Sequence, residues 1–209
     1  MRIQIVDKSG VSKDAIVALY YSFYKELRSR QGLPCGDISD YRRDVEGFLE
    51  KGDKLFIALI DDTPVGFVRI SEREGAYWIE ETFVQPEFRG RGIGKELVKA
   101  AEQYIRTRDD AAYIMVLPQD LNAIRFWLHM GYGLLNTIEL VKYLKAPPKA
   151  EDARMFEVFG FPLFIWRWRE EKYDALEAEF LATLEKFFAR KSREDFLRIV
   201  TEALRRALK

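Results

Sequence analysis

The pattern of hydrophobic and polar positions predicts a mixed α and β domain in the first part of the chain. Apolar residues alternate with polar ones, or run together at strand length, in four stretches: residues 2–6, 55–60, 65–70 and 77–84. The last stretch is expected to be the central strand of a sheet. Between the first two strands, the apolar positions repeat at helical spacing, which predicts helices beginning near Ser12 and Asp40.

The pattern continues with a helix, a buried strand and a second helix, expected at residues 93–106, 112–117 and 120–131. Asp120 is suited to cap the second of these helices, and Gly131 to end it in a left-handed conformation. Residues 132–143 predict a further strand or a strand pair. The expected order is therefore β-α-α-β-β-β-α-β-α-β.

The loop between residues 84 and 93 carries the most specific chemical signal. Pro86 cannot donate to a sheet, so the strand before it should stop there. Glycines at the alternate positions 90, 92 and 94 allow backbone N–H groups to approach an anion closely, and the following helix contributes the positive end of its dipole. Arg89 and Arg91 add positive charge. We therefore expect this loop to bind a pyrophosphate.

Two common phosphate loops do not fit. A P-loop needs Ser or Thr after Gly-Lys, but Glu96 follows Gly94-Lys95. A dinucleotide-binding loop needs G-x-G-x-x-G after a βαβ unit, and neither the spacing nor the unit is present. A glycine-rich turn without a ligand is the plain alternative. The segment Arg89-Gly90-Arg91-Gly92-Ile93-Gly94 matches [QR]-x-x-G-x-[GA], however, and it resembles the pyrophosphate loop of the GNAT acetyltransferases.

A second signature extends the resemblance to about residues 1–145. Residues 120–132 are similar to the family pattern N-x-x-A-x-x-F-Y-x-x-x-G-F. Asp120 stands where the family usually has Asn, and Trp127 where many members have Tyr. The resemblance implies the GNAT acyl-CoA N-acyltransferase fold, an α/β (α+β) arrangement in which helices cover both faces of a mixed sheet.

The resemblance also implies that acetyl-CoA is the co-substrate. Its pantetheine arm would pair with the strand backbone, its pyrophosphate would bind the loop, and the second signature would complete the site. The implied cofactor-binding residues are Thr82, Phe83, Val84, Arg89, Gly90, Arg91, Gly92, Ile93, Gly94, Lys95, Asp120, Asn122, Ala123 and Trp127.

The expected acceptor is a primary amine, which must lose a proton before it attacks. Glu80 is the expected base, directly or through water, because related acetyltransferases have a glutamate at the matching position. Glu81 is the second choice, because alternation places it on the opposite face unless a bulge intervenes. Alternatively, both glutamates are ordinary solvated strand residues. The acceptor pocket is expected at about residues 24–44.

The matching tyrosine of the family would protonate the leaving thiolate, which Trp127 cannot do. Either another hydroxyl serves as the acid, with Tyr132 the nearest in the sequence, or the thiolate leaves unassisted. Trp127 itself is expected in the core. We therefore predict an acetyl-CoA-dependent N-acetyltransferase, with a small amine or a polyamine favoured as acceptor. Two alternatives stay open: acetylation of a peptide or protein, and an acyl-CoA-binding regulatory module that has lost turnover.

The composition of the chain argues against several classes of partner and site. Lys and Arg number 34, as do Asp and Glu, so the net charge is zero, which argues against non-specific nucleic-acid binding. Cys35 is the only cysteine and His129 the only histidine, so we expect no internal disulfide and no metal site. No apolar run has the length of a signal peptide or a membrane span. A cytoplasmic protein without a membrane partner is expected.

The pattern changes after Ala146-Pro147-Pro148, so we predict an N-acetyltransferase domain at residues 1–146 and a C-terminal, mainly helical extension at 147–209. The aromatic-rich residues 155–168 suggest an added strand or cover, and residues 173–189 and 196–204 predict amphipathic helices. Their apolar surface must be buried on the core, in a homodimer interface or over the acceptor site.

Overall fold

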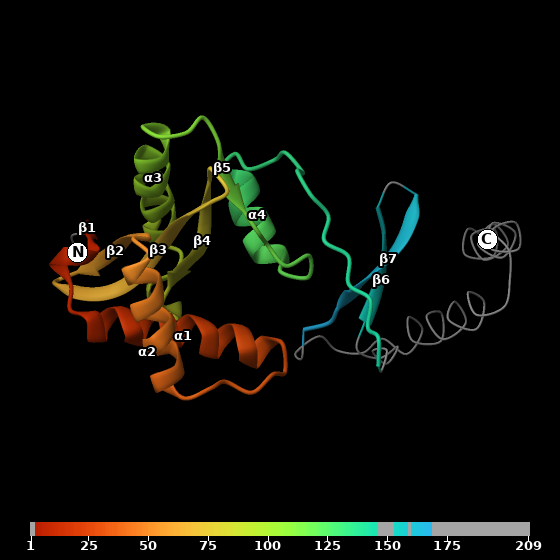
Figure 1. The fold of residues 1–209 in the computed structure, drawn as a ribbon, viewed down its shortest axis with the longest axis horizontal. Helices are drawn as coiled ribbons and strands as arrows, with labels where there is room; N and C mark the ends of the chain where they lie inside the picture. The colour runs from red at the N-terminus through yellow and green to blue at the C-terminus, as the bar shows by residue number, and fades with distance from the viewer. Residues whose placement is uncertain (1–2, 146–152, 159, 169–209) are drawn as a thin grey trace, which may run out of the picture. The chain divides into compact units, whose positions relative to one another are not determined.

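The computed structural model describes residues 3–145, 153–158 and 160–168 (Figure 1). The chain groups into two compact units, residues 1–133 and 134–209, which are described separately. The domain boundary after residue 146 stays a prediction.

A mixed five-stranded sheet forms the centre of the first unit, in the order β1-β2-β3-β4-β5. The first four strands are antiparallel neighbours, and β5 runs parallel to β4. Their bounds are β1 Ile3–Asp7, β2 Lys54–Ile60, β3 Thr63–Arg73, β4 Ala76–Val84 and β5 Ala112–Ile114. The predicted mixed sheet is confirmed, but its central strand is β3, so the prediction that residues 77–84 form the central strand is wrong.

Helices cover both faces of the sheet, as predicted (Figure 1). On one face lie α1 (Lys13–Arg30) and α2 (Ile38–Glu50); on the other lie α3 (Ile93–Arg106) and α4 (Leu121–His129). Two short 3₁₀ helices complete the unit: η1 (Lys8–Gly10) and η2 (Pro86–Phe88).

Each face has its own hydrophobic core. Leu19, Val45 and Phe67 are among the buried residues on the α1/α2 face. Ile93, Leu97, Val98, Ala101 and Ile105 of α3 are buried on the other. The periodicity that predicted this helix is therefore its packing surface.

Capping follows the sequence signals at two helices. The Ser12 hydroxyl accepts from the Ala15 N–H at 3.3 Å before α1. Gly131 has a φ of +95° after α4. The Tyr132 N–H donates to the Trp127 carbonyl at 3.0 Å, which completes a Schellman motif and confirms the predicted end of that helix.

Two predictions are wrong for β5 and for the residues that follow α4. The run 112–117 forms only the three-residue β5, whose side chains are half-buried, and Met115 is 63% exposed. Because β5 is an edge strand, its apolar sequence is not enclosed. Residues 132–143, all described, contain no strand. The final strand or strand pair predicted at these residues is therefore not present.

In the second unit, residues 153–168 form an antiparallel hairpin. It pairs β6 (Ala153–Val158) with β7 (Phe161–Trp166). Its Trp166 ring meets Tyr143 edge-on, with ring centroids 5.6 Å apart. The helices predicted at 173–189 and 196–204 lie outside the described residues.

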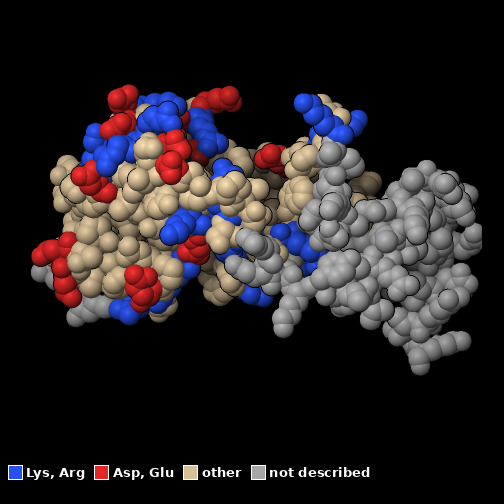
Figure 2. Space-filling model, turned by 90° about the horizontal axis from the view of Figure 1, so that it is seen from below, with Lys and Arg blue, Asp and Glu red and all other residues tan. Residues whose placement is uncertain are grey.

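The surface seen in Figure 2 mixes acidic and basic side chains. No helix within the described part of the chain combines the length and the apolar character needed to cross a membrane. A cytoplasmic location and the absence of membrane and nucleic-acid partners stay predictions.

Gly66 allows β3 and β4 to approach closely. A Cβ there would lie 2.5 Å from the Phe83 carbonyl oxygen, and real Cβ atoms do not come that near. We expect Gly66→Ala to lower the free energy of unfolding by about 1–3 kcal/mol in urea denaturation, because the backbone must shift. Gly47→Ala on α2, where a Cβ meets nothing within 4 Å, is the control and should be neutral or stabilising. Equal stability of both variants would contradict this packing argument.

Candidate active site

The strands β4 and β5 part partway along β4. They pair over only three positions, the last being Ile79 with Ile114. Beyond this point β4 continues from Glu80 to Val84 on the way to the glycine loop, without a β5 partner. The two strands therefore separate directly before the predicted pyrophosphate loop.

A β-bulge at Glu80 coincides with the point of parting. Arg69 of β3 lies opposite Glu81, and Ile70 lies opposite Ile79, so Glu80 is an extra residue on β4. A bulge bends its strand and increases the local twist, which accounts for the loss of pairing with β5.

The bulge places Glu80 and Glu81 on the same face of the sheet. Arg69, Ser71 and Arg73 are alternate residues of β3 and therefore share a face. Glu81 pairs with Arg69, whereas Glu80 contacts Ser71 and Arg73. The predicted alternation, with the two glutamates on opposite faces, is wrong for this reason. Their shared face is the one that α1 and α2 cover.

Glu81 belongs to a buried ionic network. Its carboxylate, 6% exposed, accepts from Arg69 Nε at 2.6 Å and Nη2 at 2.8 Å. The Tyr24 hydroxyl donates to it at 3.2 Å. Arg69 also pairs with Asp53, and its guanidinium lies 4.8 Å from the centre of the Phe48 ring. All these groups fix Glu81 in place.

The network perturbs its neighbours in a consistent direction. Burial, and then the charge of Glu81, raises the pKa of Tyr24 to about 12. Burial lowers the pKa of Arg69, but the Glu81 and Asp53 carboxylates outweigh it, so the net shift is upward. Arg69 and Tyr24 therefore keep their protons at neutral pH, and Arg69 stays cationic beside Glu81.

Glu81→Gln should lower the free energy of unfolding by about 3 kcal/mol, since breaking a buried ion pair costs about 3–5 kcal/mol and Asp53 still pairs with Arg69. Urea denaturation measures the effect. Glu46→Gln, which removes an exposed pair with Lys13, is the control and should change stability little. Similar losses in both variants would show that the Glu81 pair is no more important than a surface pair.

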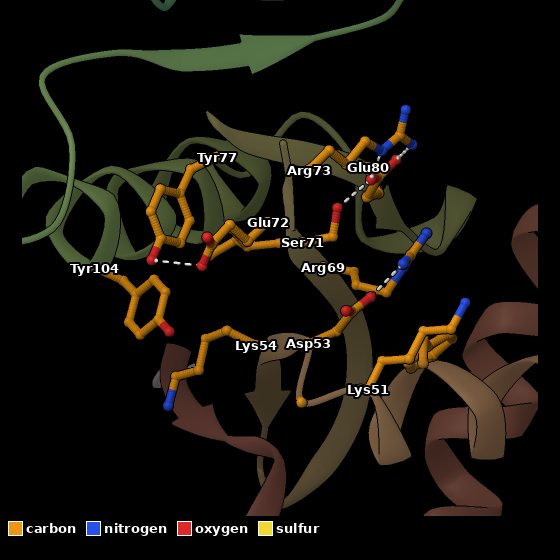
Figure 3. A pocket seen from close by; sticks show the side chains of 13 residues that line it. Lys51, Asp53, Lys54, Arg69, Ser71, Glu72, Arg73, Tyr77, Glu80 and Tyr104 are labelled. Carbon is orange, nitrogen blue, oxygen red and sulfur yellow. Dashed lines mark hydrogen bonds and ion pairs between the residues drawn. The ribbon is translucent and has the colours of Figure 1, made fainter. Parts of the chain in front are cut away.

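Glu80 is placed differently, because it lines a pocket of about 390 Å³ (Figure 3). Its carboxylate accepts from the Ser71 hydroxyl and from Arg73 Nε at 2.6 Å. The pocket is lined by Phe48, Lys51, Gly52, Asp53, Lys54, Arg69, Ile70, Ser71, Glu72, Arg73, Tyr77, Glu80 and Tyr104. It therefore does not coincide with the acceptor pocket expected at about residues 24–44.

The glycine loop has the backbone conformation of an anion cradle. Gly90 and Gly92 have φ values of +74° and +79°, and a Cβ at either would meet nothing within 4 Å. Gly92 is the N-cap of α3, and its carbonyl accepts from the Glu96 N–H at 3.1 Å. The amides of residues 93–95 therefore lie in the first turn, where no helical acceptor exists. These residues fit a pyrophosphate.

The two loop arginines make protein contacts that the sequence did not reveal. Arg89 forms a bidentate ion pair with Glu26 of α1, at 3.0 and 2.6 Å, and donates to the Val84 carbonyl at 2.8 Å. Arg91 donates to the Glu87 carbonyl at 3.0 Å. Glu26 offsets the charge of Arg89, so the main donors left for an anion are backbone amides. The same ion pair joins the loop to α1.

The three strand residues whose backbone is predicted to bind a pantetheine arm differ in their surroundings. Thr82 Oγ1 is buried and has no hydrogen-bond partner among the described residues. Phe83 is buried in the core on the α1/α2 face, while the Val84 carbonyl accepts from Arg89. Thr82 is thus the strand residue with an unmet polar group.

The second signature lies on α4, beside the loop helix. Asp120 caps α4 through the Ala123 N–H at 3.1 Å and pairs with Arg30 at 3.0 Å. Asn122 is exposed. Trp127 is 9% exposed and lies in the core on the α3/α4 face, as expected for a packing residue.

Tyr132 does not lie with the two glutamates. Its ring packs edge-on against Trp127, 5.0 Å away, on the α3/α4 face of the sheet. Burial raises its pKa, and the negative charge of Glu102 on α3 adds to the rise. The side chains that contact Glu80 are those of Ser71 and Arg73, and no motif in the sequence identified these two residues as part of the site.

The histidine and the cysteine make contacts outside the pocket beside Glu80. His129 is exposed, with Nδ1 2.6 Å from the Arg125 carbonyl. The Cys35 sulfur lies 3.4 Å from the Tyr41 hydroxyl. Within residues 3–145, 153–158 and 160–168, no group of three or more His, Cys, Asp or Glu side chains is arranged to hold a metal ion.

Comparison with known proteins agrees with this geometry. The model of the acetyltransferase (GNAT) family matches residues 15–132. An uncharacterised N-acetyltransferase of Archaeoglobus fulgidus is 33% identical over 137 residues, which is 61% of this chain and 89% of that protein. One from Methanocaldococcus jannaschii is 35% identical over 100 residues. That match covers 44% of this chain but only 41% of the relative.

Solved structures share the fold at low sequence identity. A possible acetyltransferase from Clostridium difficile has a TM-score of 0.55 and 16% identity, covering 69% of this chain and 99% of that one. The PaiA N-acetyltransferase from Thermoplasma acidophilum, solved with coenzyme A, has a TM-score of 0.52 and 18% identity, covering 62% and 89%. The family model spans more than half of the chain, and the chain therefore belongs to the acetyltransferase (GNAT) family.

Proposed function

We propose that this protein transfers an acetyl group from acetyl-CoA to a small primary amine by direct attack. The observation that carries the proposal is the parting of β4 and β5 at the Glu80 bulge, next to a glycine loop that opens a helix. The coenzyme A complex of the Thermoplasma acidophilum neighbour supports the choice of co-substrate.

Different backbone groups of this chain bind different parts of acetyl-CoA. Backbone amides of residues 90–95 bind the pyrophosphate, and the β4 edge near Thr82 binds the pantetheine arm. Acetyl-CoA supplies the activated thioester when bound. A backbone N–H of β4 stabilises the negative charge that develops on the acetyl oxygen.

Glu80 removes the proton from the amine, directly or through water. It is the glutamate that lines the pocket, whereas Glu81 is fixed by Arg69 and Tyr24. Ser71 positions its carboxylate, and Arg73 forms an ion pair with it. Tyr132 packs on the α3/α4 face, which carries the glycine loop and the second signature, and it stays the candidate acid for the leaving thiolate. Thiols are acidic enough to leave as thiolates.

The test is release of free thiol from acetyl-CoA in the presence of an amine panel, alongside calorimetric titration with acetyl-CoA. The proposal predicts both binding and amine-dependent thiol release. Binding without release would favour the alternative of an acyl-CoA-binding regulatory module. Release only with peptide substrates would favour peptide acetylation. Lack of binding would overturn the proposal. Dimer formation through residues 147–209 stays a separate prediction.

A further inference from the structure

At the pocket beside Glu80, Arg73 and Lys51 are more exposed than the Glu80 carboxylate, and the exposed Glu72 lines another part of the pocket. Arg73 covers Glu80 and is 47% exposed, whereas the Glu80 side chain is 10% exposed. Lys51, at the end of α2, is exposed and forms no ion pair within the described part of the chain. A solute that enters therefore meets Arg73 and Lys51 before it reaches Glu80.

Deeper in the pocket, Arg69 pairs with Asp53 and Glu81, and the three side chains are all largely buried, at 13%, 10% and 6% exposure. Figure 3 shows Arg73, Arg69 and Lys51 extending on the same side of β3 as Glu80. The carboxylates on this side are thus neutralised and screened by the chain's own cations.

This arrangement does not suit a polyamine. Four Lys or Arg residues line the pocket against three Asp or Glu, so a polycation gains no net attraction and must pass two cationic groups. An anion, by contrast, is attracted by these cationic groups. Carboxylates and phosphates form paired, charge-assisted hydrogen bonds with guanidinium groups, and a lysine adds a point charge.

We propose that the acceptor carries a carboxylate or a phosphate close to its amine, and that Arg73 and Lys51 bind this anion. The inference rests on the proposed function, because Glu80 is taken as the base. It adds a reason for the Arg73–Glu80 pair: an anion that engages Arg73 draws the guanidinium away from Glu80 and frees the carboxylate. Trp78, whose ring centre lies 5.3 Å from the guanidinium, keeps Arg73 nearby during this exchange.

Matched acceptors test the inference. Lysine and cadaverine differ only by a carboxylate, and glucosamine 6-phosphate and glucosamine only by a phosphate. We expect kcat/KM to favour the anionic member of at least one pair by about tenfold or more, as charged hydrogen bonds of this strength allow. The two pairs separate a carboxylate from a phosphate as the preferred anion.

Variants assign the preference to residues. Arg73→Gln and Lys51→Gln should each lower the ratio of kcat/KM between the anionic and the bare amine about tenfold, mainly through KM of the anionic substrate. Arg73→Gln should also raise turnover of the bare amine, because Glu80 is then unmasked. Lys13→Gln, an exposed lysine of α1 that does not line the pocket, is the matched control. Acetyl-CoA affinity, measured by calorimetry, should stay unchanged in both variants.

The outcomes separate the two claims. Acetyl transfer that is equal for both members of each pair, or faster to the bare amines, would overturn the anion inference and leave the acetyltransferase proposal standing. A preference that neither variant alters would also overturn it. Failure of every acceptor, anionic or bare, to release thiol would overturn the proposed function and this inference with it.

Discussion

Gly92→Val should reduce the affinity for acetyl-CoA at least about a hundredfold in calorimetric titration, since several charge-assisted backbone hydrogen bonds depend on this loop. Gly92 caps α3 with a φ of +79° and faces open space. A valine there opposes the left-handed conformation, which costs about 1–2 kcal/mol, and its side chain occupies the space where the pyrophosphate is proposed to bind.

Gly75→Val is the matched control, because Gly75 has a similar φ of +81° and equally open surroundings in the β3–β4 turn. Both variants should lose similar amounts of stability in urea, but only Gly92→Val should lose affinity. Unchanged affinity in Gly92→Val, or an equal loss in Gly75→Val, would remove the loop from the cofactor site.

Glu80→Gln should lower kcat about 10²- to 10⁴-fold at pH 7, which is the usual contribution of a general base. An alkylamine with a pKa near 10 is almost entirely protonated at pH 7, so the base is needed most there. The loss should shrink as the pH approaches the pKa of the amine, because more of the amine is then unprotonated. Rates measured from pH 6 to 10 with saturating acetyl-CoA test this dependence.

Two comparisons interpret the Glu80 result. Glu74→Gln, in the exposed turn of the same hairpin, should behave like the wild type. Glu80→Gln should lose less stability than Glu81→Gln, because its partner Arg73 is 47% exposed, and it should retain acetyl-CoA affinity. A wild-type pH profile in Glu80→Gln would exclude Glu80 as the base.

Periodic patterns and glycine chemistry made much of the fold predictable. The apolar residues at every fourth position from Ile93 to Ile105 form the buried stripe of α3. Gly90 and Gly92 mark the loop before this helix, and Gly94 lies in its first turn. These signals are local, because they depend on residues within a few positions of one another.

The rest depends on neighbours distant in sequence. The bulge at Glu80 arises from the register of β4 against β3, and it reversed the expected orientation of Glu81. Arg89 pairs with Glu26, 63 residues earlier. A continuous apolar run such as 112–117 reads the same in an enclosed strand and in an edge strand, so β5 was predicted too long and too buried.

Hydrogen exchange with and without acetyl-CoA tests the central claim most directly, namely that the parted end of β4 and the glycine loop grip the co-substrate. The amides of residues 93–95 lack helical acceptors, and the β5 side of residues 80–84 is unpaired. The account predicts that acetyl-CoA slows exchange in both segments together, while the second turn of α1 changes little. Binding of acetyl-CoA that leaves exchange in both segments unaltered would contradict it.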